Sequence, residues 1–356
     1  MPNAVGNELI ARQDDLILVT GAGGFIGSRL VAILLDHGFR NLRCFVRPSS
    51  AASRVDTLRQ LSCNGRIAIM EGNLLSREDC EAATEDVVVT FHLAAGRGAK
   101  SFSDAYLNSV VTTRNLLEAS MRRNRLKRFV NISSFAVYSN TNKLRRRVLD
   151  ESCPIETRPE LRGDAYCFAK VKQDEIVAEY GRKFGVPYVI VRPGHVYGAG
   201  NEAITGRVGT DAFGIFLHLG GSNTLPLTYV DNCVEAISLA GLTEGIDGEV
   251  FNVVDDDLPS SRQFLRLYKE NVDPFRSIFV PHVISYALCS LWGWYSEWSY
   301  AQLPPAFNRR KWHANWEKTD YSNAKLKTRL GWTPRIPTSD GLMRYFAACR
   351  NGGRNA

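Results

Sequence analysis

The sequence lacks the patterns that usually mark a metal site or a disulfide framework. Its eight cysteines form no CxxC pair and its six histidines form no HExxH motif, which argues against a bound metal. It also lacks an internal repeat, a low-complexity tract and an amino-terminal secretory signal, because the first residues are polar and include Glu8, Asp14 and Asp15. Together these absences favour a cytoplasmic protein with reduced thiols.

Long blocks of one charge are also missing, although the net charge is +7. The basic residues are spread along the chain, and the densest run is Lys143–Arg147. We interpret that run as a solvated loop and expect no nucleic-acid partner; attraction of a phosphorylated substrate or an anionic membrane is the alternative. With 356 residues, of which 44% are hydrophobic and 23% charged, the chain is typical of one large α/β domain or of a two-lobed globular protein.

A glycine-rich turn near the amino terminus is the clearest local signal in the chain. The segment 16–19 is apolar, as in a buried parallel strand, and an apolar pattern of helical period follows the turn. Between them lie Gly21, Gly24 and Gly27, with Gly23 as a fourth glycine. Such a turn lets the backbone approach a pyrophosphate, and the next helix presents free N–H donors and a partial positive charge. The segment therefore predicts a dinucleotide-binding turn.

Strands and helices are expected to alternate through the first half of the chain. Further strands are expected at 42–46, 66–70, 87–93, 128–132, 187–191 and 249–254, and helices at 104–123, 164–184 and 232–242. This alternation predicts a parallel, doubly wound α/β sheet with its ligand crevice at the carboxyl ends of the strands. The stretch 139–163 is expected to be a surface loop, and 194–222 is rich in glycine and less regular.

The residue that follows the second strand bears on the choice of cofactor. An acidic side chain at this position binds the ribose 2′-hydroxyl of NAD, whereas arginine accommodates the 2′-phosphate of NADP. The sequence has Arg47 there, which favours NADP over NAD. The alternative is that Arg47 stacks over adenine, or faces solvent, in a protein that uses NAD.

Several polar side chains lie where they could take part in catalysis. The strand at 128–132 leads into Ser133 and Ser134. A later helix carries Tyr166 and Lys170, whose spacing of four residues places them on one helix face. His92 falls inside a strand, and we predict that it is a packed core histidine rather than a catalytic one.

One apolar segment, 278–300, stands apart from this pattern. It is interrupted by Pro281 and Gly293, and its apolar length is marginal for a membrane span. We expect a helix that covers the substrate pocket or packs in a smaller lobe. An interfacial helix, with its tryptophans and Tyr295 at the level of lipid headgroups, is the main alternative, ahead of a transmembrane helix.

A set of short motifs runs through the chain nearly from end to end. They are TGAGGFIG (20–27), FHLAA (91–95), NSVVTTRNLLEA (108–119), SSFAVY (133–138), YCFAK (166–170), RPGHVYGAG (192–200), TYVDN (228–232) and LGWTP (330–334). In this order they resemble the extended short-chain dehydrogenase/reductase family of NAD-dependent epimerases/dehydratases and 3β-hydroxysteroid dehydrogenase-like enzymes. The resemblance implies a Rossmann-type NAD(P)-binding domain, mainly 15–193. It also implies a smaller substrate lobe, mainly 194–350, from which about 228–255 returns to the Rossmann domain.

The resemblance implies a catalytic set as well. Tyr166 matches the family's catalytic base or acid, Lys170 its partner, and Ser134 the hydroxyl that holds the substrate oxygen; Ser133 is the fallback if the register differs by one. A phenol titrates near pH 10 in water, so nearby positive charge is needed to favour phenolate at neutral pH. Lys170 and an oxidised nicotinamide would supply that charge while hydride leaves the substrate carbon.

The residues expected around the two ligands come from most of these motifs. For the dinucleotide they are Gly21, Gly24, Phe25, Ile26, Gly27, Arg47, Asn73, Leu74, Leu93, Ala94, Ala95, Tyr166, Lys170 and Pro193. For the substrate or its diphosphate they are Ser133, Arg192, His195, Asn201, Arg207 and Tyr229. A homodimer through the helices at 104–123 and 164–184, an arrangement common in relatives, is compatible with their apolar faces.

The predicted activity is that of an NAD(P)-dependent oxidoreductase or epimerase acting on a secondary alcohol or ketone, foremost of a nucleotide-linked sugar. Dehydration of a sugar is disfavoured, because dehydratases of the family carry an acidic pair after the serine and Phe135–Ala136 has none. The first alternative is a dehydrogenase or reductase of a steroid-, terpenoid- or lipid-like alcohol, which Arg47 and the segment 278–300 favour. A remote alternative is a non-catalytic NAD(P)-sensing protein, which would not need an activated phenol.

Overall fold

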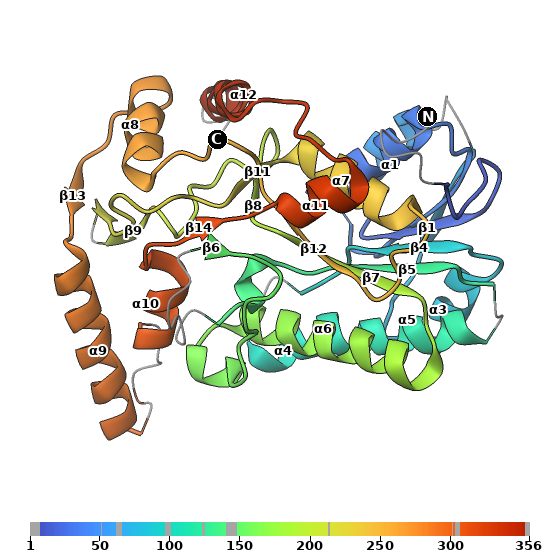
Figure 1. Cartoon of the computed structure of the whole chain (residues 1–356), viewed down its shortest axis with the longest axis horizontal. Coiled ribbons are helices and arrows are strands. Elements are labelled where there is room, and N and C mark those ends of the chain that lie inside the picture. Colours follow the sequence, from blue (N-terminus) through green and yellow to red (C-terminus); the bar gives the residue numbers. More distant parts are fainter. Residues whose placement is uncertain are drawn as a thin grey trace.

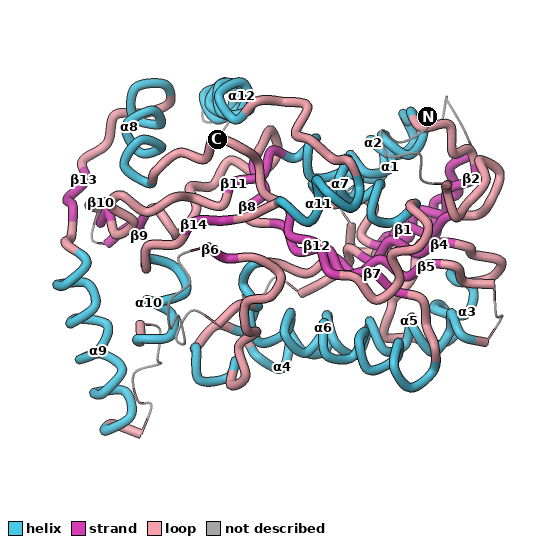
Figure 2. The backbone as a smooth tube through the Cα atoms, viewed as in Figure 1, coloured by secondary structure: helices cyan, strands magenta, loops and turns pink. Residues whose placement is uncertain are grey.

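Seven parallel strands form the central sheet of the protein (Figure 1; Figure 2). In neighbouring order they are β12 (Val250–Val253), β7 (Tyr188–Pro193), β5 (Arg128–Ile132), β4 (Val89–His92), β1 (Ile17–Thr20), β2 (Asn41–Val46) and β3 (Arg66–Glu71). Each strand pairs in parallel with its neighbours, which confirms the predicted α/β sheet. The computed structural model describes residues 8–50, 52–61, 66–96, 101–122, 125–139, 148–212, 214–300, 302 and 307–352, so the basic run Lys143–Arg147 lies outside the described residues.

Helices cover both faces of this sheet, as Figure 1 shows. One layer contains α1 (Phe25–Asp36), α2 (Ala52–Leu61; labelled in Figure 2), α7 (Val230–Leu242) and α11 (Ala324–Leu330), and the other contains α3 (Arg77–Thr84), α4 (Phe102–Tyr106), α5 (Thr112–Met121) and α6 (Ala165–Phe184). Because both faces are covered, β1, β4 and β5 are buried along their whole length. The strand order reverses beside β1, and a doubly wound sheet binds its ligand at such a point.

The helix expected at 104–123 is not regular. Between α4 and α5 the chain forms a π-helical segment, η2 (Leu107–Val111). The Thr113 hydroxyl donates to the Ser109 carbonyl at 2.5 Å, and the Ser109 hydroxyl accepts the Gly96 N–H at 3.0 Å. These side-chain contacts compete with the ordinary backbone pattern, and a π-helical turn of this kind often lies near a functional site.

The smaller lobe is built from short sheets and the helices around them. Its strands are β8 (His195–Tyr197) with β11 (Leu227–Tyr229), β9 (Gly209–Ala212) with β10 (Ile215–His218) and β13 (Ser277–Phe279), and β14 (Asp320–Tyr321) with β6 (Val148–Leu149). Its helices are α8 (Ser261–Asn271), α9 (His282–Trp298), α10 (Arg309–Trp316) and α12 (Thr338–Gly352). The helix expected within 278–300 is therefore present as α9. Among the described residues, no helix is long and apolar enough to cross a membrane.

The stretch 139–163 is only partly the surface loop that its polar sequence predicts. Glu156 and Arg162 are both buried. Arg310 of α10 forms an ion pair with Glu156 at 2.7 Å, and Arg162 donates to the Ala136 carbonyl at 2.6 Å. Charged side chains are rarely buried unless they are paired, and here partners from distant parts of the chain supply that pairing. This stretch therefore joins α10 to the region that follows β5.

Candidate active site

The glycine turn between β1 and α1 leaves no room for side chains at two positions. Gly21 has a φ of +69°, and a Cβ on it would lie 3.0 Å from the Ala94 nitrogen. A Cβ on Gly27 would lie 2.9 Å from the Ala22 Cα and closer still to the Gly21 carbonyl oxygen. Only glycine fits such close approaches of backbone to backbone. The turn therefore brings the ends of β1 and β4 against the start of α1.

The amino terminus of α1 is suited to an anion. Its N-cap, Gly24, makes no side-chain capping bond, and the first turn contains no acidic residue. The first N–H groups of a helix, here including those of Phe25 and Ile26, have no intrahelical partner and attract negative charge. Arg29 extends from the next turn and donates to the Ala199 carbonyl at 3.4 Å, which brings the loop after β8 over this helix end. These residues fit the pyrophosphate of a dinucleotide.

One buried histidine links the carboxyl ends of β1 and β4 to η2 and α5. His92 is fully buried, which confirms its prediction as a core residue, and burial is the main cause that lowers its pKa to about 3. Its Nε2 lies 2.9 Å from Thr113 Oγ1, and its Nδ1 lies 2.8 Å from Thr20 Oγ1. Because the Thr113 hydroxyl donates to Ser109, it accepts from Nε2 of His92. Nδ1 then accepts from Thr20, whose oxygen also accepts the Ala94 N–H at 3.3 Å.

Ser134 and Tyr166 meet beyond the carboxyl end of β5. Ser134 is the N-cap of the 3-10 turn η3 (Phe135–Val137), and its oxygen accepts the Ala136 N–H at 3.1 Å. Tyr166 lies in the first turn of α6, which Asp164 caps. Burial raises the pKa of Tyr166, and a hydrogen bond with the Ser134 hydroxyl opposes that rise. Tyr166 as a whole residue is partly exposed.

Lys170 lies one turn farther along α6 and is 4% exposed. Its Nζ donates to the Ile132 carbonyl at 2.6 Å and to Gln173 Oε1 at 2.8 Å. Burial lowers the pKa of Lys170 to about 8, and Asp174 opposes that change. Lysine has three N–H donors, so within the described residues one remains for a ligand. Gln173 also donates to Thr113 at 2.9 Å, which joins Lys170 to the histidine chain.

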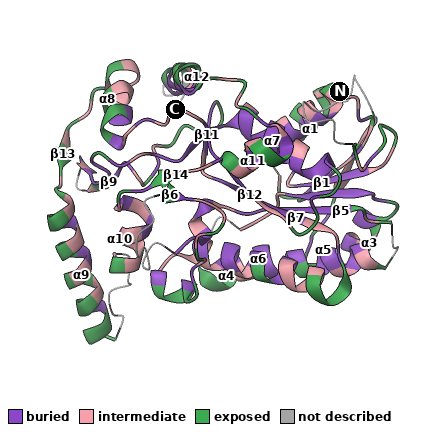
Figure 3. Cartoon of the chain, in the orientation of Figure 1, coloured by how far each residue is buried: buried purple, intermediate pink, exposed green. Residues whose placement is uncertain are grey.

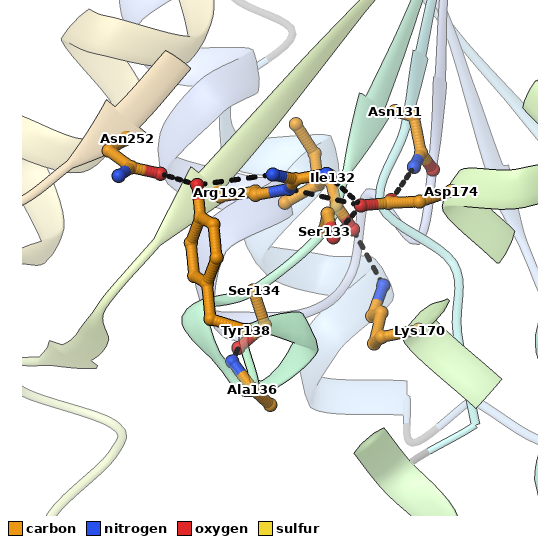
Figure 4. A network of polar contacts seen from close by, with 10 residues as sticks. All are labelled: Asn131, Ile132, Ser133, Ser134, Ala136, Tyr138, Lys170, Asp174, Arg192 and Asn252. Atoms are coloured by element: carbon orange, nitrogen blue, oxygen red, sulfur yellow. Dashed lines mark hydrogen bonds and ion pairs between the residues drawn. The ribbon is translucent and has the colours of Figure 1, made fainter. Parts of the chain in front are cut away.

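Asp174, the next residue on this face of α6, is the centre of the network in Figure 4. It accepts from Asn131 at 2.9 Å, from the Ser133 hydroxyl at 2.9 Å, and from two guanidinium nitrogens of Arg192 at 3.0 and 3.1 Å. Arg192 also donates to the Tyr138 hydroxyl at 3.1 Å. Ser133 and Arg192 are both buried. The polar groups of Ser133 and Arg192 therefore hold β5, β7 and α6 together. Of the two adjacent serines, Ser134 is the one that contacts the Tyr166 phenol.

The other expected cofactor residues lie along the carboxyl edge of the sheet. Arg47 is exposed directly after β2. Asn73 is exposed after β3, where its N–H donates to Asp79 at 2.6 Å, and the neighbouring Leu74 is buried. The rest of the set comprises Leu93, Ala94 and Ala95, which are partly exposed after β4, and Pro193, which is buried at the end of β7. The set spans the sheet from β3 to β7.

The expected substrate residues fall into two groups. His195 and Arg207 lie near each other, since burial and the Arg207 charge together lower the pKa of His195 to about 4. Arg207 donates to the Tyr321 hydroxyl at 3.2 Å. By contrast, Asn201 donates to a backbone carbonyl, that of Val196, at 2.8 Å. Tyr229 is also in the second group, because it is buried with its ring against Tyr197.

Sequence reasoning missed two kinds of residue in this region. Asp174 lies four residues after Lys170, so the same helical spacing that paired Tyr166 with Lys170 could have found it. Tyr321 stacks on Phe135 with ring centroids 5.6 Å apart, and so connects Ser134's neighbour to Arg207. No local pattern marks that contact, because the two aromatic residues lie far apart in the sequence.

The carboxyl edge of the sheet thus carries a glycine cradle, a helix end suited to phosphate, and a serine, a tyrosine and a lysine beyond β5. The model of the NAD dependent epimerase/dehydratase family matches residues 17–253, more than half of the chain. The protein belongs to this family. It is an enzyme of the extended short-chain dehydrogenase/reductase type, as its motifs predict. The family is NAD-dependent, and the cradle fits such a cofactor.

Proteins similar to this chain differ in what their names say they act on. GDP-mannose 3,5-epimerase 1 from Oryza sativa subsp. indica is 26% identical over 349 residues, covering 93% of this chain and 80% of its own. A 4-hydroxy-2-methyl-3-oxo-4-farnesyl-3,4-dihydroquinoline-1-oxide ketoreductase from Stigmatella aurantiaca is 29% identical over 71% of this chain and 72% of its own. The structure of UDP-glucuronic acid 4-epimerase from Bacillus cereus in complex with NAD superimposes with a TM-score of 0.70 at 23% identity, covering 96% and 98% of the two chains. The chain is thus similar to a sugar-nucleotide epimerase and to a ketoreductase of a farnesylated ring.

Proposed function

We propose that the protein is an NAD(P)-dependent epimerase or oxidoreductase that acts on a secondary alcohol or ketone of a nucleotide-linked sugar. The observation that carries the proposal is the hydrogen bond between the Ser134 hydroxyl and the Tyr166 phenol, one turn from the buried Lys170. A binding protein has no need of such a set, since it does not have to move a proton. Similarity to sugar-nucleotide epimerases over nearly the whole chain supports the substrate class.

Each residue of the set has a task that its contacts support. The Ser134 hydroxyl holds the substrate oxygen, and Tyr166 removes the proton from that oxygen or returns it. Lys170 stays mainly protonated at pH 7, because its pKa is about 8, and its positive charge favours the phenolate. Bound NAD(P) supplies the acceptor and donor of hydride. Asp174 fixes the ends of β5 and β7, through Ser133 and Arg192, around the substrate carbon.

For the cofactor we propose a preference for NADP. Arg47 is exposed directly after β2, and Arg54 is exposed in the first turn of α2, where its Cβ lies beside Gly23 of the glycine turn. Two guanidinium groups around this strand end would favour a 2′-phosphate over a 2′-hydroxyl. The same family model is compatible with NAD, so binding measurements with both cofactors decide the point.

A dehydrogenase or reductase of a lipid-like alcohol is the second candidate. Two observations favour it: the ketoreductase of a farnesylated ring among the relatives, and the exposed apolar side chains of α9 in the lobe that carries His195 and Arg207. In either case we assign the substrate contacts to Ser134, His195, Arg207 and Tyr321. We assign a structural role to Ser133, Asn201 and Tyr229. They contact Asp174, the Val196 carbonyl and the Tyr197 ring, respectively.

The remaining assignments concern the chain as a whole. We propose that 15–193 is mainly the NAD(P)-binding domain and 194–350 mainly the substrate lobe. Within the latter, about 228–255 returns to the NAD(P)-binding domain; the pairing of β12 with β7 and the packing of α7 against α1 support this. The seven described cysteines are free, which supports a cytoplasmic location. A homodimer through the faces of α5 and α6 completes the proposal.

The test starts from the freshly purified protein. Mass spectrometry identifies any retained cofactor, and a panel of nucleotide sugars and hydrophobic ketones is then assayed by chromatography and by NAD(P)H absorbance. Tyr166→Phe should lower turnover by at least about 100-fold and leave dinucleotide affinity within a few-fold. Tyr180→Phe is the matched control, because Tyr180 lies on the same helix and donates to Glu118 instead. Full activity of Tyr166→Phe would overturn the mechanism.

A further inference from the structure

The helix α9 is amphipathic in the opposite sense to an ordinary surface helix. Its buried positions, Ser285, Cys289 and Ser296, are small, and beside them Tyr286 and Trp292 pack their rings against Trp312 and Phe307. The Ser285 hydroxyl accepts from the Trp312 indole of α10 at 2.9 Å. A Cβ on Gly293 would lie 3.5 Å from the nearest atom of α10's N-cap residue, so this side of α9 lies close to the neighbouring helix.

The large apolar side chains lie on the other side of α9, toward solvent. Val283 is 81% exposed, Leu291 62%, Trp294 64% and Trp298 66%. We call the following exposed residues the α9 face: Ile278, Phe279, Val283, Ile284, Leu288, Leu291, Trp294, Tyr295, Trp298 and Tyr300. Figure 3 shows this helix at one end of the molecule, exposed along much of its length. A contiguous apolar surface of this kind marks an interaction site, because a monomer in water would bury such side chains.

The residue types change along the α9 face. The aliphatic side chains, such as Val283 and Leu288, lie in its first half, whereas Trp294, Tyr295 and Trp298 lie in its last turns. Tryptophan and tyrosine combine an apolar ring with a polar group and are favoured at the level of lipid headgroups. At about 1.5 Å per residue a helix of this length measures about 25 Å, which suits a helix lying in the membrane surface.

Four cations lie beside the start and the middle of the α9 face. Arg276 is exposed directly before β13, and Arg262 lies over the Phe279 ring at 5.5 Å. Arg309, the first residue of α10, lies beside the middle of α9, where it donates to the Ser290 hydroxyl at 3.0 Å. Lys311 follows two residues later on α10. No ion pair within the described residues involves any of these four cations. The exposed Glu297 is the acidic exception on α9.

This charge distribution suits a membrane as the occupant of the α9 face. Arg262 and Arg276 lie at its start, and Arg309 and Lys311 lie beside its middle. An anionic lipid surface attracts all of them at once. We propose that the α9 face binds the surface of an anionic lipid bilayer, with α9 parallel to the membrane plane.

The attachment of α9 shows where bound membrane would lie. Its neighbour α10 is held by the Arg310–Glu156 ion pair and by a hydrogen bond from the N-cap residue of α10 to the Arg162 carbonyl at 3.0 Å. Arg162 in turn donates to Ala136 beside Ser134. These contacts connect α9, through α10, to the region beside Ser134, so a membrane bound to the α9 face would lie on the substrate lobe. The inference goes beyond the proposed function and does not require it, because the α9 face binds lipid whatever the substrate is.

The test is flotation of the full-length protein with vesicles. Wild-type protein should float with vesicles of 3:1 phosphatidylcholine to phosphatidylglycerol at low salt, and less with phosphatidylcholine alone. The double variant Val283→Asp/Leu291→Asp should bind at least about tenfold more weakly. Arg276→Gln/Arg309→Gln should lose roughly fivefold per cation on anionic vesicles. Met343→Asp, which alters an exposed apolar residue of α12, is the matched control and should bind as wild type does.

Two further measurements keep the outcome decisive. Melting temperature and NAD(P)H binding establish that each variant is folded, and light scattering gives the oligomeric state. Absence of binding by folded wild-type protein to both vesicle types would overturn the inference. Equal binding by wild type and Val283→Asp/Leu291→Asp would also overturn it. A third contrary outcome is a wild-type protein that does not float but forms a dimer, which Val283→Asp/Leu291→Asp dissociates.

Discussion

The Nε2 atom of His92 lies 2.9 Å from the hydroxyl oxygen of Thr113, and this contact connects the cofactor end of the sheet with the catalytic helix. On one side His92 accepts from Thr20, directly before the glycine turn. On the other side Thr113 accepts from Gln173, which accepts from Lys170. A neutral, buried chain of polar groups thus holds the proposed ammonium in position. We infer that the chain sets the position of Lys170 and acts on catalysis only through it.

The first prediction removes the central hydroxyl of this chain. Thr113→Val leaves the donors of His92 and Gln173 without their acceptor, which should cost about 2 kcal/mol of folding free energy. Lys170 then loses its fixed partner, so kcat should fall several-fold and the pH profile of kcat should shift. KM for the dinucleotide should change less. Urea denaturation and pH–rate profiles measure these effects.

The neighbouring threonine provides the control for that prediction. Thr112 is also buried and donates to the Ser109 carbonyl at 3.2 Å, but within the described residues no hydrogen bond joins it to His92 or Gln173. Thr112→Val should therefore lose some stability and keep the wild-type pH profile. If both variants lose stability and neither shifts the profile, Thr113 has only a structural role.

The second prediction concerns Asp174. Asp174→Asn leaves the Arg192 guanidinium buried without its countercharge, and breaking such a buried pair should lower the free energy of unfolding by about 3 to 5 kcal/mol. Glu175→Gln is the control on the same helix, because its ion pair with Lys172 is exposed to solvent and should be worth less than about 1 kcal/mol. Urea denaturation of both variants gives the two values. A loss below about 1 kcal/mol in Asp174→Asn would contradict the central role of this carboxylate.

Local patterns in the sequence were sufficient for the sheet and for part of the site. The apolar run before Gly21 predicts β1, because a parallel strand buried on both faces must be apolar throughout. The four-residue spacing of Tyr166 and Lys170 predicts their common helix face, because helical geometry alone fixes it. These features depend on residues that are close in the sequence.

Other features depend on contacts that no local pattern encodes. The π-helical segment η2 arises where Gly96 and Thr113 bond to Ser109 from opposite directions in the chain. Tyr321 reaches Phe135 only because β14 pairs with β6. Helical periodicity predicts that α9 has one apolar side, but it does not say that this side faces solvent. The contacts that the opposite side makes with α10 decide that orientation, and α10 lies far from the start of α9 in the sequence.

The third prediction concerns the glycine turn. Gly27→Ala directs a methyl group at the Gly21 carbonyl, so the turn must move; this should cost about 1 to 3 kcal/mol and weaken dinucleotide binding at least about tenfold. Gly206→Ala is the control, because a Cβ there meets nothing within 4 Å. Fluorescence titration with NADH and NADPH measures the affinities. Wild-type affinity in Gly27→Ala would mean that the turn does not cradle the cofactor.

The fourth prediction tests the cofactor preference. Arg47→Gln should weaken NADPH binding by about tenfold or more, because a charge-assisted hydrogen bond contributes about 1.5 to 3 kcal/mol, and should change NADH binding less than about twofold. Arg59→Gln is the control, since Arg59 lies on α2 and pairs with Asp56. Titration of stripped protein with both cofactors gives the ratio. Equal losses for the two cofactors would assign Arg47 to adenine stacking instead.

The last prediction uses the buried ring of His92 as a pH probe. Its pKa is about 3 in the folded protein, against 6.5 for an ordinary histidine, so between these values the unfolded chain binds one more proton at this residue. Acid therefore favours unfolding: the stability of wild-type protein relative to His92→Gln should be constant above pH 6.5 and fall by about 1.4 kcal/mol per pH unit below it. The other buried histidines are present in both proteins, so their contributions cancel in the difference. Urea denaturation at several pH values between 7 and 4.5 measures the two curves, and curves that stay parallel would show that His92 is protonated as easily in the folded protein as in the unfolded chain.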